Sequence, residues 1–112
     1  MADDEGEMKI NQQPIPPQAL ADPNAVEMAR IWIANRELVC TLKVGMYRES
    51  SKIPEEKAWG VILADLARHV SNALEEGYGG NAQASLDAII ESLNQEIGNP
   101  TSKARGKFHR QN

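Results

Sequence analysis

The sequence predicts a small α+β domain in which an antiparallel β-hairpin is covered by two amphipathic helices, in the order ββαα. Two observations carry this prediction. Apolar and polar residues alternate over residues 38–46, which is typical of a half-buried strand. Apolar residues then recur at helical spacing over residues 54–76 and 82–97. With 112 residues, 41% of them hydrophobic, the chain has the size and composition of one globular domain, which leaves no room for a separate cofactor domain.

The hairpin is predicted from two strands joined by a tight turn. The first runs over residues 28–34, where Arg30-Ile31-Trp32-Ile33 is β-branched and aromatic. Asn35-Arg36 is a suitable turn because Asn tolerates a positive φ. The second strand runs over residues 38–46 and is followed by a polar loop. Its apolar residues share one face by alternation; they are Leu38, Cys40, Leu42, Val44 and Met46.

Both helices have recognisable ends. The first is predicted over residues 54–76, because Pro54 and the two acids after it suit a first helical turn and Gly77 suits the end. Its apolar stripe consists of Trp59, Ile62, Leu63, Leu66, Val70, Ala73 and Leu74. The second helix starts at the N-cap Asn81 and stops before Gly98, with the stripe Leu86, Ile89, Ile90, Leu93 and Ile97. The short Gly-rich link predicts two helices that pack antiparallel or at a steep angle to each other. The absence of a Gly-Lys-Ser/Thr sequence argues against a phosphate loop.

Two segments of opposite charge flank the predicted domain, which we expect over residues 23–100. Residues 1–22 are an acidic, Pro-rich arm, expected to be disordered at first and then extended. Asp22-Pro23 is typical of a helix start, so we expect either a short helical turn or an irregular segment before the first strand. Residues 101–112 are a flexible tail with four basic residues and no acid. The net charge is −4, which argues against nucleic-acid binding by the domain itself.

Composition also limits the compartment and the chemistry. With Cys40 as the single cysteine, neither an intramolecular disulfide nor a zinc site built on cysteine pairs can form. The N-terminus lacks an apolar signal core, and no run reaches the ~18 apolar residues of a membrane helix. We therefore expect a soluble cytoplasmic protein. Thiamin, nicotinamide, lipoyl and pyridoxal signatures are absent, so no cofactor is expected, and no metal.

Three stretches resemble a family of short bacterial proteins, mainly alphaproteobacterial, that is catalogued only as a domain of unknown function. They are Arg30-Ile31-Trp32-Ile33, the strand end at Gly45-Met46-Tyr47, and residues 58–69 (AWGVILADLARH). The resemblance covers roughly residues 25–108, including Ala-Arg-Gly at 104–106. It implies a small α+β fold and a bacterial cytoplasm. It implies no activity, substrate or site residue.

One group of residues could form a ligand niche or an enzyme site. Asp65 and His69 are i, i+4 neighbours on the first helix, and a His oriented by a carboxylate can act as a general base. Trp59 could line the niche, and Cys40 could act as a nucleophile. The structural alternative is favoured: Asp65, Arg68 and His69 form an exposed charged cluster, Cys40 is a small core residue, and Trp59 is core, with Gly60 beside it allowing close packing. No catalytic residue is therefore assigned.

The first strand carries apolar residues on both faces, since Trp32 cannot share a face with Ile31 and Ile33. Two helices cover only one face, so the second cover comes from the N-terminal arm, through Ile15 and Leu20, or from another copy of the chain. The arm is Pro-rich and offers few apolar side chains, so we expect a homodimer with Trp32, Ile31 and Ile33 at the contact. The favoured function is a non-enzymatic protein-interaction or regulatory module whose protein partner the sequence does not identify. The alternatives are a small-molecule-binding protein or enzyme using Trp59, Asp65 and His69, and a nucleic-acid accessory acting through the basic tail.

Overall fold

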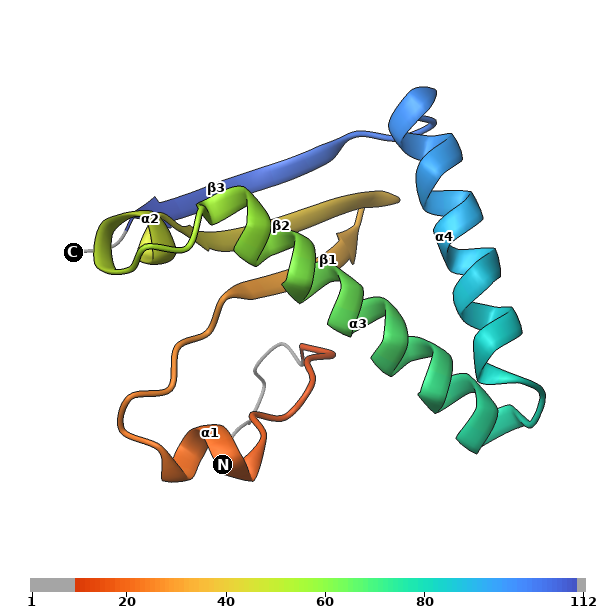
Figure 1. Ribbon diagram of the computed structural model, residues 1–112, viewed down its shortest axis with the longest axis horizontal. Coiled ribbons are helices and arrows are strands. Elements are labelled where there is room, and N and C mark those ends of the chain that lie inside the picture. The colour runs from red at the N-terminus through yellow and green to blue at the C-terminus, as the bar shows by residue number, and fades with distance from the viewer. Residues whose placement is uncertain (1–9, 111–112) are drawn as a thin grey trace.

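A computed structural model describes residues 10–110 (Figure 1). The chain folds as a small α+β domain containing a β-hairpin, a third strand and helices, as the sequence predicted. The elements, in chain order, are α1 (Pro17–Ala21), β1 (Ala29–Ala34), β2 (Glu37–Val44), α2 (Met46–Ser50), α3 (Glu55–Tyr78), α4 (Ala82–Gly98) and β3 (Ala104–Arg110).

The three strands form one sheet in the order β1-β2-β3. β1 and β2 are antiparallel and are joined by Asn35 and Arg36, whose φ values of 54° and 64° are both in the left-handed region. Two positive φ values are the signature of the tight hairpin turn that follows the twist of its strands, so the predicted turn is confirmed. β3 runs parallel to β2, and all three helices after the hairpin lie in the connection between them. A parallel pair needs such a long crossover.

The C-terminal segment differs from its prediction. The basic residues after Gly98 were expected to form a flexible tail, whereas residues 104–110 form strand β3, an edge of the sheet (Figure 1). Gly106 lies opposite Cys40 with φ 139°, and a Cβ built on it would overlap the Cys40 carbonyl oxygen. Glycine is therefore required for this approach. The alternation of β3 is weak, because Ala104, Gly106 and Phe108 share the apolar face but only Phe108 has a large apolar side chain.

Two shorter segments also differ from the prediction. Residues 46–50 form the helix α2, where a strand end and a polar loop were expected. Residues 17–21 form the helix α1 in place of an extended strap, and Asp22 accepts a hydrogen bond from the Asn24 N–H (2.9 Å) in the turn that follows. Pro16 and Pro17 explain α1, because proline is well suited to the first turn of a helix. The disorder expected for the start of the arm falls largely on residues 1–9, which lie outside the described residues.

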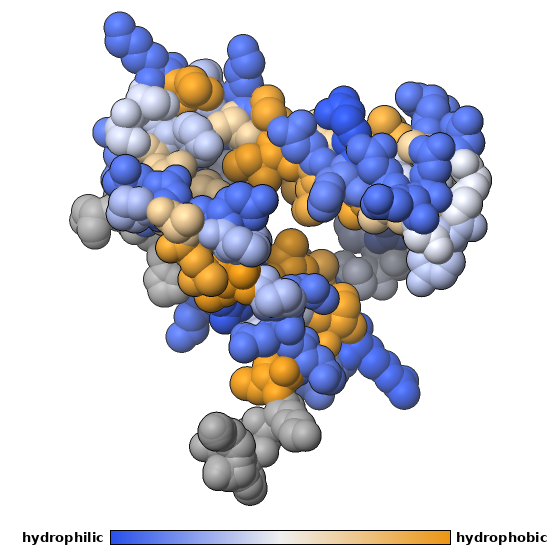
Figure 2. Space-filling model, turned by 90° about the horizontal axis from the view of Figure 1, so that it is seen from below, coloured by the Kyte–Doolittle hydropathy of each residue, from blue (hydrophilic) through white to orange (hydrophobic). Residues whose placement is uncertain are grey.

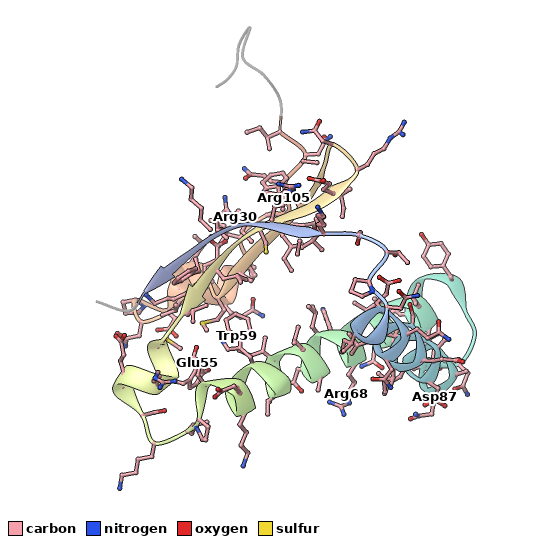
Figure 3. All side chains as sticks on the ribbon, turned by 90° about the horizontal axis from the view of Figure 1, so that it is seen from above. Arg30, Glu55, Trp59, Arg68, Asp87 and Arg105 are labelled. Carbon is pink, nitrogen blue, oxygen red and sulfur yellow. The ribbon has the colours of Figure 1, made fainter. Side chains whose placement is uncertain are left out.

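The sheet has an apolar face and a mixed face, as the register defines them. Cross-strand partners lie on the same face, so one face carries Ile31, Ile33, Leu38, Cys40, Leu42, Val44 and Phe108. Arg30 and Arg105 belong to the other face, and Figure 3 shows both on the side of the sheet that is turned away from α3. The apolar face is therefore turned toward α3.

α3 and α4 form the predicted helical hairpin. α3 ends at Tyr78, two residues beyond the predicted end, with Gly79 as C-cap at φ 80°. Asn81 caps α4 as predicted, because its side chain accepts the Ala84 N–H at 2.9 Å. Ser71 is fully buried, and its hydroxyl donates to the Ala67 carbonyl (2.9 Å). Small side chains at this point of α3 allow α4 to pack closely.

The described chain encloses very little core. Among residues 10–108 only Gly45, Glu55, Ala58 and Ser71 are buried, and two of these four are polar. The radius of gyration is 16.8 Å, against about 13 Å for a compact domain of this length. Figures 1 and 3 show the reason: α3 leaves the sheet as it runs toward Tyr78, and α4 comes back to the sheet at its C-terminal end, where the chain leads into β3.

Candidate interaction surface

A buried carboxylate fixes the end of the molecule where the sheet meets the helices. Glu55, in the first turn of α3, is 8% exposed. Its Oε2 accepts hydrogen bonds from the Gly45 N–H (2.9 Å) and from the Trp59 indole Nε1 (2.8 Å). Its Oε1 accepts the Arg48 N–H (2.9 Å). Glu55 thus caps the N-terminus of α2, whose own N-cap Gly45 offers no side chain.

These hydrogen bonds stabilise the ionised form of Glu55. The Gly45 N–H lowers the pKa of the Glu55 carboxyl below its ordinary value of 4.5, and burial opposes this effect. The N–H groups of Arg48 and Tyr47 and the Trp59 indole lower the pKa further. All of these donors belong to the protein itself, so the carboxylate acts as a structural clamp and has no free oxygen lone pair aimed at a ligand.

From the sequence, Glu55 was expected only as a favourable charge at the helix N-terminus, and its role as a clamp was not predicted. One signal was available in the spacing of Glu55 and Trp59, which are i, i+4 and therefore neighbours on one helical face. The bonds from Gly45 and Arg48 reach Glu55 over ten and seven positions, across a short helix that the sequence did not predict.

Trp59, Asp65 and His69 do not come together as a niche. Trp59 is half-buried and points from α3 toward the sheet (Figure 3). Asp65 and His69 are exposed, and the Asp65 carboxylate pairs with Arg68 at 3.3 Å. Among the hydrogen bonds and ion pairs of residues 10–110, none joins Asp65 to His69.

The other residues considered for catalysis, metal binding or close packing do not form a site either. Cys40 is a half-buried free thiol on the apolar face of the sheet. No group of three or more His, Cys, Asp or Glu side chains within the described residues could hold a metal ion. Gly60 faces open space, so the close neighbour expected beside it is not supplied by the described part of this chain. No helix among those described is long and apolar enough to cross a membrane.

Basic residues of β3 now lie on the mixed face of the sheet. The register places Lys107 opposite Thr41, which in turn is opposite Arg30 of β1. It places Arg105 opposite Val39, which in turn is opposite Trp32 of β1. Carboxylates offset part of this charge: Arg105 pairs with Glu37 (3.0 Å), and Arg30 pairs with Glu27 (3.0 Å). The basic segment is therefore part of the sheet and is partly neutralised by the chain's own acids.

The prominent surface feature is apolar. Along α3 the stripe Leu63, Leu66, Val70 and Leu74 is 39–55% exposed. On the apolar face of the sheet, Ile31 is 52% and Ile33 is 76% exposed, and both lie toward the hairpin end, away from α2. Figure 2 shows apolar residues gathered around an opening between the helical hairpin and the rest of the molecule. We call this set of six residues the open apolar surface.

Trp32 belongs to the opposite face of β1 and is half-buried. A groove of about 880 Å³ lies along β1, and Trp32 lines it together with Ile31, Ile33, Pro14 and Ile15. The N-terminal arm therefore runs beside the β1 edge without closing onto it. β1 keeps a free edge and exposed isoleucines, which together are features of a strand that lacks a partner.

The fold and surface define a class: a small α+β domain with a three-stranded mixed sheet, a projecting helical hairpin and an open apolar surface. The chain belongs to the family described as a domain of unknown function, DUF5076, whose model matches residues 12–101. This confirms the family resemblance seen in the sequence. A comparison with the curated proteins gave no match.

Similar solved structures include one of a protein from the photosynthetic bacterium Rhodopseudomonas palustrus CGA009, which is named a "putative pyruvate dehydrogenase". Its sequence is 23% identical, the TM-score is 0.62, and the match covers 88% of this chain and 94% of that one. At this identity the likeness establishes the fold alone. The high coverage of both chains shows that the two are of similar extent.

Proposed function

We propose that the protein is a non-enzymatic protein-interaction or regulatory module that works as a homodimer. The observation that carries the proposal is the open apolar surface: the residues that should form a core are largely exposed in the single chain. Monomeric proteins rarely expose apolar patches larger than a few hundred Å², and larger ones mark interaction sites. The proposal includes Ile31, Ile33 and Trp32 as contact residues, and a bacterial cytoplasmic location that rests on the family resemblance.

The sparse core gives the proposal an energetic argument. Burial of apolar surface supplies most of the stability of a small domain, at roughly 25 cal/mol for each Å² removed from water. A chain whose only buried apolar side chain among residues 10–108 is Ala58 obtains little of this stabilisation by itself. A partner that covers the open apolar surface would supply the missing burial, so folding and association should be coupled.

An enzyme that uses Trp59, Asp65 and His69 has less support. Asp65 is engaged by Arg68, and the Trp59 indole is held by Glu55. The name of the similar structure does not change this assessment, because a likeness at 23% identity carries only the fold. The buried carboxylate, Glu55, has its hydrogen-bonding capacity used within the protein.

Urea unfolding at several protein concentrations tests the proposal. If folding is coupled to dimer formation, the midpoint rises as the concentration is raised from low to high micromolar. A midpoint that does not move with concentration, in a single cooperative transition, would mean that the monomer is stable by itself and would overturn the homodimer. Circular dichroism at 222 nm and tryptophan fluorescence should report the same transition.

A further inference from the structure

We infer that the second copy is held mainly through α3, whose apolar stripe packs antiparallel against the same stripe of the partner about a twofold axis. This inference rests on the proposed function and specifies its architecture. In it, the α3 helices of two copies form the centre of the dimer, and each helix completes the apolar core beneath the other copy's sheet.

The sequence of α3 has the spacing of a helix–helix seam. Trp59, Leu63, Leu66 and Val70 follow one another at intervals of four, three and four residues. Such 4-3-4 spacing keeps apolar side chains along one line of a helix that packs against another helix. α4 leaves this line largely uncovered, because Leu63, Leu66 and Val70 remain 42–55% exposed whereas Ser71, on another side of α3, is buried. The seam therefore exists without a partner in the single chain.

The position of the sheet selects the antiparallel direction. Trp59 and Ile62, near the N-terminus of α3, are half-buried, whereas Leu66, Val70 and Leu74 are exposed where α3 has left the sheet (Figures 1 and 3). Parallel packing would bring two sheets to the same end of the helix pair and leave the far end open. Antiparallel packing puts one sheet at each end. The exposed half of each α3 then lies beside the partner's sheet.

Ile31 and Ile33 fit the same arrangement. They lie on the sheet face turned toward α3, at the end where α3 has moved away. The C-terminal half of the partner's α3 would fill that opening and cover these side chains together with its own Leu66 and Val70. One twofold contact thus covers both the helical part and the sheet part of the open apolar surface. In a symmetric dimer the same surface of each copy must form the contact, and this arrangement meets that requirement.

The size of the surface agrees with a second copy as its occupant. The six side chains expose on the order of 500–600 Å² per chain, before any polar rim is added, and a stable complex of standard size buries about 800 Å² on each partner. A chain that lacks its own core needs a partner that is present whenever the chain is made, and another copy of itself meets this condition.

Cross-linking with single cysteines tests the arrangement. In a Cys40→Ala background, Leu63→Cys, Leu66→Cys and Val70→Cys place a thiol on the seam, while Val61→Cys and Arg68→Cys place one on the back of the same helix. A short bismaleimide is added at micromolar protein, and covalent dimer is measured on denaturing gels. We expect at least one seam position to give at least tenfold more covalent dimer than either back position. Circular dichroism confirms that each variant is folded.

The outcomes separate this inference from the proposed function. If the protein is dimeric by light scattering but the seam positions cross-link no better than Val61→Cys and Arg68→Cys, the α3 contact is wrong and the homodimer stands. If the protein is monomeric by light scattering and no position cross-links, both fail. Seam cross-linking that persists at fivefold lower protein concentration, with the back positions silent, supports both.

Discussion

The indole Nε1 of Trp59 donates a 2.8 Å hydrogen bond to Oε2 of Glu55, one helical turn earlier, and the same oxygen accepts the N–H of Gly45. The Glu55 carboxylate thus joins the start of α3 to the start of α2, and Trp59 holds that carboxylate while its own ring lies toward the sheet (Figure 3). Packing and hydrogen bonding at this residue can be separated. Trp59→Phe keeps most of the ring and should lower the melting temperature by a few degrees. Trp59→Ala also removes the packing and should cost ~3 kcal/mol or more. Equal effects from the two variants in thermal melts would argue against a role for the indole N–H.

Stability should fall in acid because of Glu55. Its pKa is lowered in the folded state, so the unfolded chain binds the proton more readily and protonation favours unfolding. The contribution is complete above the ordinary pKa of 4.5 and is lost as the pH falls through the folded pKa. Glu55→Gln should lower the melting temperature at pH 7 and flatten the decline below pH 4.5, whereas Glu56→Gln should change neither. Some decline should remain, because the Thr101 N–H lowers the pKa of Glu96 as well.

β3 should depend on Gly106. A side chain there would overlap the backbone of Cys40, and φ 139° is a conformation that other residues rarely adopt. Gly106→Ala should therefore separate β3 from β2 and lower stability by ~2 kcal/mol or more, and deletion of residues 103–112 should have a similar effect. Gly77→Ala is the matched control, since a Cβ at Gly77 meets nothing within 4 Å. A truncated chain that melts like the full one would restore the flexible tail that the sequence predicted.

Gly60 lies within α3, and a Cβ built there meets no atom within 4 Å in the described chain. Glycine inside a helix costs about 1 kcal/mol relative to alanine. Gly60→Ala should therefore raise the urea midpoint if nothing from another chain approaches this point. A lower midpoint, together with weaker association, would indicate that the partner's backbone packs against Gly60.

Ile33 tests the sheet part of the open apolar surface. At 76% exposure it contributes little to the single chain, so Ile33→Ser should weaken self-association about tenfold while leaving the circular dichroism spectrum of concentrated protein unchanged. Val61, 53% exposed on the back of α3, is the matched control, and Val61→Ser should leave association unchanged. Sedimentation velocity over a dilution series gives both values. Equal effects from the two substitutions would exclude a specific role for Ile33.

The hairpin, its turn and both long helices could be predicted from the sequence, because the signal for each lies in neighbouring residues. These signals are the alternation in the second strand, the tolerance of Asn35 for a positive φ, and the N-cap Asn81. Local signals were insufficient for β3. Its pairing is parallel and non-local, Phe108 is its one large apolar side chain, and its strongest signal is one glycine, Gly106, whose role appears only beside Cys40. The Asp65–His69 pair shows the opposite error: correct helical spacing placed the two as neighbours, yet Arg68 engages the carboxylate.

The central claim, that the open apolar surface is covered by a second copy of the chain, is tested most directly by the mass in solution. Light scattering during size-exclusion chromatography at tens of micromolar should give twice the chain mass of 12.3 kDa for the wild type, and a lower mass for Leu66→Ser or Ile33→Ser on dilution. A wild-type mass of 12.3 kDa over the whole concentration range, from a folded sample, would contradict the account.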